Sequence, residues 1–431
     1  MKITDFRSLL DNGSFEDPIT PAALNGHELS ELISPISCEE FVSTYFSKVS
    51  LNVEGTSKKF NHIFSWERLK QALKRGESIT DKHYNITASF TGGEDSGDPR
   101  VMIDAYHSQV IELLNAGATV CISNIQIADP FLAKWALAIR AQLNFSGTVG
   151  INCYISADGS GLPMHYDSRV ATSIQIAGKK RWRYATKPAK AWPSSNEVYN
   201  EGLNESEVGS LPDDMEFREV ELNPGDMLCL PAGVWHSARG IGCSLALNLS
   251  FSPLNYLDQL MPFLKKYATS NPDWRGGPPV IAEKIQGNIP QEISTYMNER
   301  LDEFHKIVQK AFSNTDELIE PWLTSLTRAP YTDCTTQLRS IPDITPSQQF
   351  KVTDPPLRYI EFQNRLIISF DNDLHRFPVN LAPMLQRLSS APVSFTIPEI
   401  LSLQHESNSL TQNEIIHYMQ VLYKFGIINK V

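Results

Sequence analysis

The sequence predicts a mixed α+β protein in which an antiparallel β-sandwich or barrel is flanked by largely helical parts. Three patterns lead to this prediction. Residues 150–253 form short alternating or apolar runs that Gly and Pro interrupt, which is typical of antiparallel strands. Residues 65–75 and 290–312 carry apolar residues at helical spacing. Residues 340–357 are punctuated by proline and indicate a domain boundary or linker.

The composition is that of a folded globular protein. The chain has 431 residues, of which 41% are hydrophobic and 20% are charged, and a domain usually takes ~100–200 residues. The formal net charge of −11 argues against broad attraction to nucleic acid or to anionic membranes. The sequence shows no run of the ~18–20 apolar residues that span a bilayer and no signal-peptide pattern at its start. We therefore expect two or three domains and a cytoplasmic location.

The barrel is expected to have an α/β extension on its N-terminal side. Residues 65–75 and 105–116 predict helices, and residues 117–125 predict a strand. The segment 188–226 is rich in Ser, Asn, Glu and Pro and is too long for a hairpin turn, which indicates a lid or an insertion. We assign all of residues 1–253 to this domain. Its barrel strands are expected at residues 151–156, 170–177, 180–186, 217–222, 226–231 and 243–251.

The C-terminal part is expected to divide into residues 254–340 and residues 341–431. In the first, the helix 290–312 carries an apolar stripe that would pack against another helix or a second subunit. The stripe consists of Ile293, Met297, Leu301, Phe304 and Ile307. The second predicts a strand, three helices and a short terminal strand, as in a winged-helix unit. Residues 351–431 contain seven basic and seven acidic residues, so we expect protein contacts and no direct nucleic-acid binding.

The residues with the clearest chemical role lie in the barrel. His165 and Asp167 are two positions apart, so a strand would direct both side chains to the same face. His236 follows a Pro-Gly-Asp turn and an LPAG segment, and it could supply a third ligand if the two strands pair. Two histidines and one carboxylate form the facial triad of non-haem Fe(II) oxygenases, which leaves coordination positions open. A single His-x-Asp occurs by chance, and the order of these elements within one β-rich span carries the prediction.

Two further residues fit a site of this kind. A 2-oxo acid could bind such a metal through its carboxylate and keto oxygens, and its far carboxylate would need a cation. Lys180, shortly after Gly178, is a candidate for that cation. Asn248 lies on the small, polar face of the strand 243–251, whose leucines alternate onto the opposite face. A strand facing a cavity would have this pattern.

Taken together, these segments resemble the JmjC/cupin-fold Fe(II)- and 2-oxoglutarate-dependent oxygenases, and most closely their ribosomal-oxygenase branch. The motifs that carry the resemblance are N-x-Y (Asn152, Tyr154), G-L-x-x-H-Y-D (Gly161 to Asp167), Q-x-x-G-x-K-x-W-R (Gln175 to Arg183) and P-G-D-x-L-x-L-P-x-G-x-x-H (Pro224 to His236). The resemblance implies a double-stranded β-helix (cupin or jelly-roll) core, a helical dimerisation segment and a winged-helix-like C-terminal domain. It also implies Fe(II) at His165, Asp167 and His236, the distal carboxylate of 2-oxoglutarate at Lys180, and Asn248 and Tyr154 nearby.

We therefore expect a homodimeric dioxygenase that uses Fe(II), 2-oxoglutarate and O2 to hydroxylate a protein side chain, for example in a ribosomal protein, with release of succinate and CO2. One alternative is the same chemistry on a peptide natural product or a small metabolite. An alternative from another class is a cupin-fold protein that binds a metal without turnover, which would have no need of a counter-ion such as Lys180. Demethylation of methyl-lysine is a further variant, but the sequence shows no aromatic cage or reader module that favours it.

Overall fold

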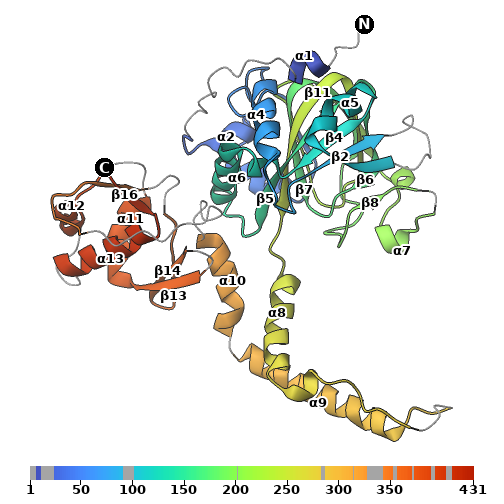
Figure 1. Ribbon diagram of the computed structural model, residues 1–431. Coiled ribbons are helices and arrows are strands. Elements are labelled where there is room, and N and C mark those ends of the chain that lie inside the picture. The colour runs from blue at the N-terminus through green and yellow to red at the C-terminus, as the bar shows by residue number, and fades with distance from the viewer. Residues whose placement is uncertain are drawn as a thin grey trace. The chain divides into compact units, whose positions relative to one another are not determined.

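The protein is described here by a computed structural model, which divides into two compact units, Met1–Pro253 and Leu254–Val431. The first unit combines a large antiparallel sheet with helices (Figure 1), so the expected mixed fold class is confirmed. No helix in the described part of the chain is long and apolar enough to cross a membrane. The boundary expected between residues 340 and 341 lies outside the described residues. The structure describes residues 6–10, 24–90, 101–200, 202–282, 287–313, 315–327, 343–352, 357–370, 373–389, 394–403 and 410–431.

Two long antiparallel neighbours, β7 (Val170–Ala185) and β11 (His236–Ser252), form the centre of the sheet. The sequence predicts two strands over the span of β7, but the structure has one. Gly178 lies where the break was expected, with a φ of 62°, and a Cβ there would lie 1.9 Å from the Cys243 carbonyl oxygen. Glycine therefore lets the strand continue through a local irregularity in its pairing with β11.

The other strands extend the sheet on both sides of this pair. On one side, β11 pairs with β5 (Thr148–Ser156), which continues into β4 (Thr119–Ser123), β2 (Asn85–Phe90) and β3 (Val101–Ala105). On the other side, β7 pairs with β10 (Met227–Leu230), which pairs with β1 (Leu51–Val53). Beside this path lie β6 (Gly161–Tyr166), β8 (Glu197–Val198) and β9 (Phe217–Leu222).

Helices α4 (Trp66–Gly76) and α6 (Pro130–Gln142) share one buried core with the strands β2, β4, β5 and β11. Each begins at a capping side chain: Ser65 accepts a hydrogen bond from the Arg68 amide, and Asp129 accepts bonds from the first turn of α6. The helix expected over 105–116 is split into η2 (His107–Gln109) and α5 (Val110–Asn115). The remaining elements of the unit are α1 (Phe6–Leu10), α2 (Glu28–Ile33), α3 (Cys38–Glu40), η1 (Phe41–Tyr45), η3 (Ile125–Ile127), α7 (Glu205–Val208) and η4 (Pro212–Asp214).

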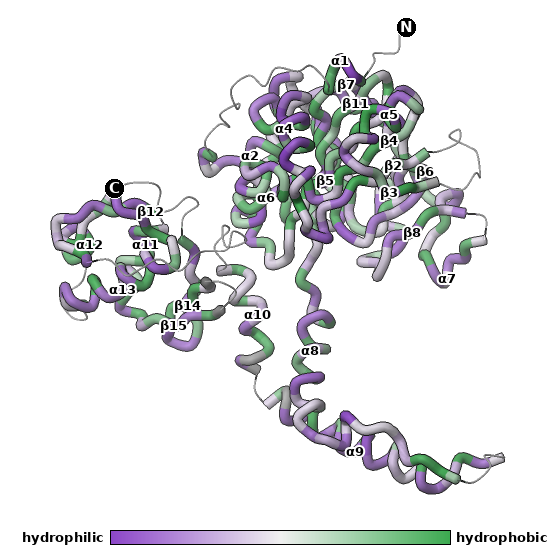
Figure 2. The backbone as a smooth tube through the Cα atoms, viewed as in Figure 1, coloured by the Kyte–Doolittle hydropathy of each residue, from purple (hydrophilic) through white to green (hydrophobic). Residues whose placement is uncertain are grey.

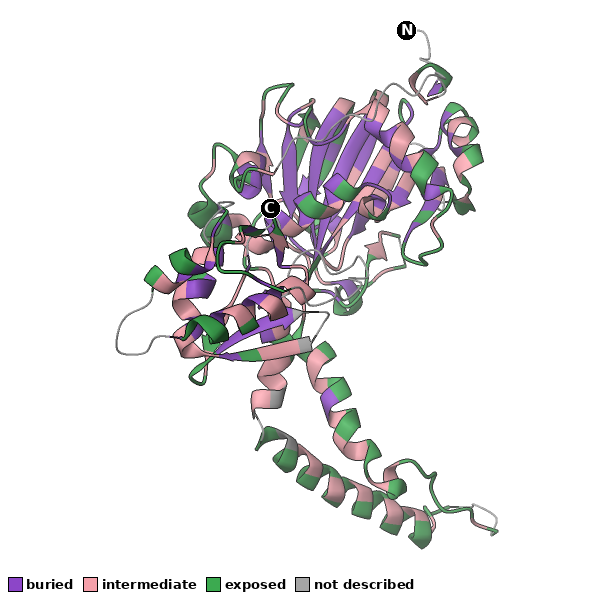
Figure 3. Cartoon of the chain, turned by 60° about the vertical axis from the view of Figure 1, so that its left-hand side comes forward, coloured by how far each residue is buried: buried purple, intermediate pink, exposed green. Residues whose placement is uncertain are grey.

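The second unit begins with α8 (Tyr256–Thr269), η5 (Pro272–Trp274), α9 (Gln291–Phe312) and α10 (Thr315–Thr327). The expected helix is present as α9, along which polar and apolar residues alternate (Figure 2). The described residues cover its apolar stripe only in part, since Met297 is 52% exposed and Leu301 is 55% exposed. Figure 3 accordingly colours α9 as exposed or intermediate along its length.

The C-terminal residues have a buried core of their own, with Leu366, Met384 and Ile415 fully enclosed. The strand expected over 359–370 is a hairpin, because Gln363 and Asn364 adopt positive φ angles of 50° and 57° and turn the chain. The elements are β12 (Phe350–Val352), β13 (Ile360–Phe362), β14 (Arg365–Phe370), β15 (Asp373–Pro378), η6 (Val379–Leu381), α11 (Ala382–Ser389), α12 (Ile397–Ser402), α13 (Gln412–Lys424) and β16 (Ile428–Lys430), and β16 pairs with β12.

Candidate functional site

The structure brings together the three residues that the sequence predicts as metal ligands. His165 lies on β6, His236 is the first residue of β11, and the two are direct partners in the β6–β11 pairing. Asp167 follows directly after β6. The potential ligand atoms of all three lie within 4.8 Å of one another, and the two imidazole centroids are 4.2 Å apart. No other group of three His, Cys, Asp or Glu residues in the described ranges has this arrangement.

Backbone hydrogen bonds select the tautomer of both histidines. The Nδ1 atom of His165 lies 2.7 Å from the Pro163 carbonyl oxygen, and that of His236 lies 2.8 Å from the Val234 carbonyl oxygen. A carbonyl oxygen can only accept, so each Nδ1 donates its proton and each Nε2 carries the lone pair. Neutral imidazoles with a lone pair on Nε2 are the form that binds a metal ion, and both rings are buried. The pair is therefore prepared for a divalent cation.

Asp167 is oriented by a residue that the sequence reasoning missed. The Nδ2 atom of Asn196 donates to Asp167 Oδ1 at 2.8 Å, and Asn196 Oδ1 accepts from the Ser168 amide at 2.8 Å. The other carboxylate oxygen, Oδ2, lies 4.0 Å from His236 Nε2. Asn196 belongs to the segment 188–226 that the sequence indicates as a lid or insertion. Part of that segment thus supports the metal-binding carboxylate, although no spacing in the sequence links the two residues.

Lys180 is a buried cation that no described carboxylate neutralises. It lies on β7, is 4% exposed, and its Nζ atom is 5.5 Å from the ring centre of Tyr154. Burial lowers the pKa of Lys180 to about 8, while the Cys153 thiol opposes the shift. Trp182, two residues further along the same face of β7, stacks near His236 with ring centroids 5.8 Å apart. Lys180 thus belongs to the same barrel interior as the His-Asp-His cluster.

The structure also places Asn248 and Tyr154 on this interior face. On the paired strands β11 and β5, Ala246 is opposite Tyr154 and Asn248 is opposite Asn152. Asn248 is 7% exposed, and its Oδ1 atom has no hydrogen-bond partner among the described residues. The alternate leucines of β11 are fully buried on the opposite face, as the sequence predicts; they are Leu245, Leu247 and Leu249. An unmatched buried acceptor indicates a position where a ligand or water completes the hydrogen bonding.

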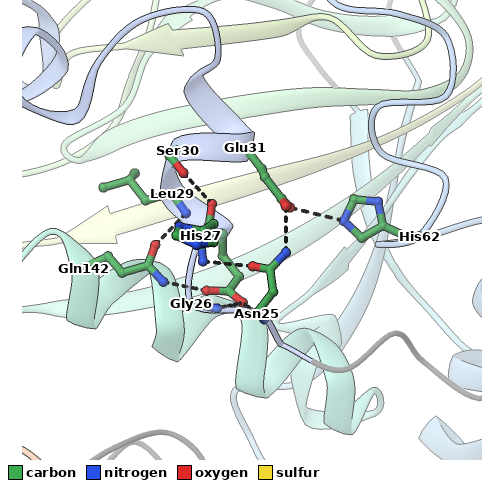
Figure 4. Close-up of polar contacts among 9 residues, drawn as sticks. Asn25, Gly26, His27, Leu29, Ser30, Glu31, His62 and Gln142 are labelled. Atoms are coloured by element: carbon green, nitrogen blue, oxygen red, sulfur yellow. Dashed lines mark hydrogen bonds and ion pairs between the residues drawn. The ribbon is translucent and has the colours of Figure 1, made fainter. Parts of the chain in front are cut away.

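Two cavities in the described part of the first unit bear on the search for a site. The larger, about 590 Å³, is bordered by charged residues that include Glu28, Glu31 and Lys59. These residues already have protein partners: Glu31 accepts a hydrogen bond from Asn25 (Figure 4). Glu28 accepts hydrogen bonds from two backbone amides, and Lys59 donates to the Ser34 carbonyl. Its lining shares no residue with the metal cluster. We therefore assign no role to this cavity in the chemistry.

A smaller cavity, about 330 Å³, opens beside the barrel interior at the ends of β2, β4, β5 and β11. Its lining is almost entirely polar. Arg169, two residues beyond Asp167, and Asn152, two residues before Tyr154, both contribute to it. Two residues that line this cavity are therefore only two positions away in the sequence from a predicted metal ligand, Asp167, and from the predicted co-substrate residue Tyr154.

Comparison with known proteins assigns this part of the chain to a family. Residues 126–258 match the family model of the JmjC domain. The chain contains a JmjC domain. The predicted resemblance to this family is thus confirmed, and the match includes the His-Asp-His cluster and Lys180. A JmjC domain with an intact cluster of this kind supports a 2-oxoglutarate-dependent oxygenase.

Relatives of this chain include a Bacillus subtilis protein, the uncharacterized YxbC, which is 25% identical over 59% of this chain and 79% of its own length. A Drosophila persimilis protein named bifunctional lysine-specific demethylase and histidyl-hydroxylase NO66 is 27% identical over 55% of this chain. Gallus gallus ribosomal oxygenase 1 is 24% identical over 54% of it. The matches span only 34% of that NO66 and 38% of that oxygenase.

The same fold is found in solved structures. The ribosomal oxygenase YcfD from Escherichia coli, solved in complex with cobalt and 2-oxoglutarate, aligns with a TM-score of 0.55. The alignment covers 92% of this chain and 98% of YcfD at 12% sequence identity. At this identity the likeness concerns the fold, and it extends beyond the JmjC domain into the second unit.

Proposed function

We propose that this chain is an Fe(II)- and 2-oxoglutarate-dependent dioxygenase that hydroxylates a protein side chain and releases succinate and CO2. The observation that carries the proposal is Lys180, a buried cation without a described carboxylate partner on the same barrel interior as the His-Asp-His cluster. A buried charge without a partner is costly, and a ligand carboxylate would remove that cost. A protein that only bound a metal would gain nothing from it.

His165, Asp167 and His236 would hold the metal. The donor set fits Fe(II), since two imidazoles with Nε2 lone pairs and one carboxylate occupy one side of the ion and leave the rest open. When bound, Fe(II) supplies the reduction of O2 that is coupled to decarboxylation of 2-oxoglutarate. The protein's part is to orient these ligands: the carbonyls of Pro163 and Val234 hold the two rings, and Asn196 holds the carboxylate.

Lys180 would bind the distal carboxylate of 2-oxoglutarate, with Tyr154 and Asn248 nearby. A charge-assisted hydrogen bond to an ammonium group in a dry interior gives both affinity and orientation. The aromatic rings of Trp182 and Tyr184 lie on the same face of β7 and are buried, so they limit access of water to this end of the barrel. Binding the co-substrate at one fixed end leaves its 2-oxo acid group directed towards the metal ligands.

The acceptor is proposed to be a protein side chain, with a ribosomal protein as the first candidate. The names of NO66, ribosomal oxygenase 1 and YcfD favour this class. The NO66 name also includes lysine demethylation, which uses the same cofactors. A peptide natural product or small metabolite is the second candidate, and it is favoured by the modest volume, about 330 Å³, of the polar cavity to which Asn152 and Arg169 contribute. A non-catalytic cupin protein is the candidate from another class.

We further propose that the second unit serves assembly. The stripe on α9 includes Met297, Leu301 and Phe304, which are all exposed in the single chain. Burying exposed side chains of this kind against a second copy would be favourable by roughly 25 cal/mol per Å² of apolar surface. Residues 254–340 would then be a dimerisation segment, and residues 341–431, with their three helices and small paired strands, a winged-helix-like domain for protein contacts.

The experiment that tests the proposed function is the O2-dependent conversion of 2-oxoglutarate to succinate by the Fe(II)-loaded full-length protein. Wild type, Asp167→Ala and Lys180→Ala would be compared with and without a pool of ribosomal proteins. We expect the wild type to turn over, Asp167→Ala to lose turnover and metal binding, and the pool to stimulate succinate formation. Mass spectrometry of the pool would then show a gain of about one oxygen atom on one protein.

The other outcomes separate the alternatives. Basal turnover that the pool leaves unchanged would favour a peptide or a metabolite as the acceptor. Bound metal without any turnover would favour the non-catalytic cupin protein. Wild-type succinate formation by Asp167→Ala would contradict the ligand assignment.

A further inference from the structure

The small polar cavity beside the barrel interior has a charge pattern of its own. Its volume is about 330 Å³, and its lining includes the cations Lys82 and Arg169 together with His83, but no Asp or Glu. Neither Lys82 nor Arg169 forms an ion pair with a described carboxylate. In the sequence, Asp81 adjoins Lys82 and accepts a hydrogen bond from the His83 amide at 2.8 Å, and Asp167 lies two residues before Arg169, but neither acid is part of the lining. The cavity therefore carries an excess of positive charge.

Hydrogen bonds within the wall occupy the acceptor oxygens of two lining residues, Asn152 and Asn124. The side-chain oxygen of Asn152 accepts a hydrogen bond from the Asn124 backbone amide at 3.1 Å. The Asn124 side chain is also engaged: its Nδ2 atom donates to the His83 carbonyl, and its Oδ1 atom accepts from Gln126. The lining also contains the two cations and a set of amide and hydroxyl side chains, which are Asn85, Ser123, Thr148, Asn152, Ser250 and Ser252. Such a set suits an acceptor-rich, negatively charged group.

Several residues that line the cavity are close neighbours, along the strands, of the predicted metal and co-substrate residues. Asn152 and Tyr154 are two residues apart and therefore lie on the same face of β5. Asn248 and Ser250 lie on the same face of the neighbouring strand β11. Arg169 is two residues beyond the predicted metal ligand Asp167. Gly150, which also lines the cavity, leaves no room for a side chain, since a Cβ there would lie 2.8 Å from Asn124 Oδ1. The larger cavity described above shares none of these residues.

We propose that this cavity binds a carboxylate of the substrate, so that the residue hydroxylated is an acidic residue or its immediate neighbour. Lys82 and Arg169 attract the carboxylate, and the Asn152 amide and Ser250 hydroxyl complete its hydrogen bonds. A cationic acceptor such as arginine would meet two like charges and no carboxylate. The inference rests on the proposed function for the chemistry, and it adds the charge class of the substrate.

A binding experiment tests the cavity separately from the chemistry. The probe is an equimolar mixture of N-acetyl-aspartate amide and N-acetyl-arginine amide, observed by saturation-transfer NMR with full-length protein. Saturating 2-oxoglutarate and cobalt(II) are present so that Lys180 is occupied. We expect the aspartate signal to exceed the arginine signal at least threefold in the wild type and to fall in Lys82→Glu and in Arg169→Gln. Lys58→Glu, the same charge change at an exposed lysine outside the cavity, should keep the preference.

An activity experiment uses two peptide pools that are identical except for a fixed central Asp or Arg. With Fe(II), 2-oxoglutarate and O2, we expect at least tenfold more oxygen incorporation in the aspartate pool. Equal incorporation, a preference for the arginine pool, or succinate formation with neither pool modified would overturn the inference. If no succinate forms in any reaction, the proposed function fails, and the NMR preference still decides whether the cavity selects an anion.

Discussion

Two regions of the first unit each enclose a buried cation, but only one of them pairs it with a described carboxylate. Between α4 and α6, Arg68 is 5% exposed and bonds Asp129 at 2.5 Å and the Ile63 carbonyl at 2.7 Å. Its guanidinium also lies 4.5 Å from the ring centre of Phe131. In the barrel, Lys180 is 4% exposed and has no described carboxylate partner. The first cation completes the fold, whereas the second leaves an electrostatic requirement that only a ligand can meet.

The largest effect is expected when the first region is made to resemble the second. Asp129→Ala would leave Arg68 buried without its carboxylate and would also remove the cap of α6. Removing one partner of a buried ion pair costs about 3–5 kcal/mol. We therefore expect the free energy of unfolding to fall by an amount of that order. Urea denaturation measures it. Asp104→Ala, at an exposed position on β3, is the control and should change the free energy by less than about 0.5 kcal/mol.

The stability of the barrel should depend on pH through Lys180. Its folded pKa of about 8 lies below the unfolded value of 10.5. Above pH 8 the folded state loses this proton while the unfolded state keeps it, so stability rises with pH until about pH 10.5. Between about pH 7.5 and about pH 9.5 the gain should be about 2 kcal/mol in the ligand-free protein. Urea denaturation should show this gain in wild type relative to Lys180→Met, and parallel curves for the two proteins would contradict it.

Removing the second cation should affect ligand binding more than folding. Lys180→Met keeps the volume of the side chain and deletes its charge, and a hydrogen bond to a charged group contributes about 1.5–3 kcal/mol. We expect the Kd of 2-oxoglutarate to rise about ten- to a hundredfold, as measured by calorimetry. The neighbouring Lys179→Met is the matched control, since Lys179 is exposed and pairs with Glu221. An unchanged Kd in Lys180→Met would contradict the proposed role.

The smallest effect is expected at the residue that orients the metal-binding carboxylate. Asn196→Ala would remove the donor to Asp167 without touching the ligand atoms. Loss of an outer-shell partner of this kind typically weakens metal binding about tenfold or more. Competition with a fluorescent chelator would measure it, and Asn200→Ala, an exposed amide in the same segment, should leave the affinity unchanged.

Much of the barrel could be predicted because the patterns that indicate its strands involve residues that are close together in the sequence. Alternation of residue type predicts β5, β9 and most of β11, and the spacing of His165 and Asp167 predicts that they share a face. The position of β7 was predicted, but its continuity was not. A glycine within a strand pattern is consistent with the end of the strand or with an irregularity inside one continuous strand. Which of the two is present depends on the pairing with β11.

The residues that sequence reasoning missed depend on the path of the chain in space. Asn196 reaches Asp167 from a segment without regular periodicity, and Asn124 reaches Asn152 from a turn in which it adopts a φ of 51°. Nothing in the spacing of these residues relates them. The homodimer, the winged-helix-like domain and the ligand roles stay predictions, because they concern a second chain or bound molecules.

The continuity of β11 has a consequence for how new substrate ranges could arise. One strand carries His236 at its first residue and Ser250 near its end, so the metal cluster and the small cavity are connected through β11, whose pairing with β7 shifts register between Ile241 and Ala246. Inserting or deleting one residue between them would reverse which side chains face the interior. Engineering that aims to alter the accepted substrate should therefore leave this strand untouched. Substitutions at the loop positions Lys82, Asn124 and Arg169 would change the lining of the cavity without changing the register of the strand that carries His236.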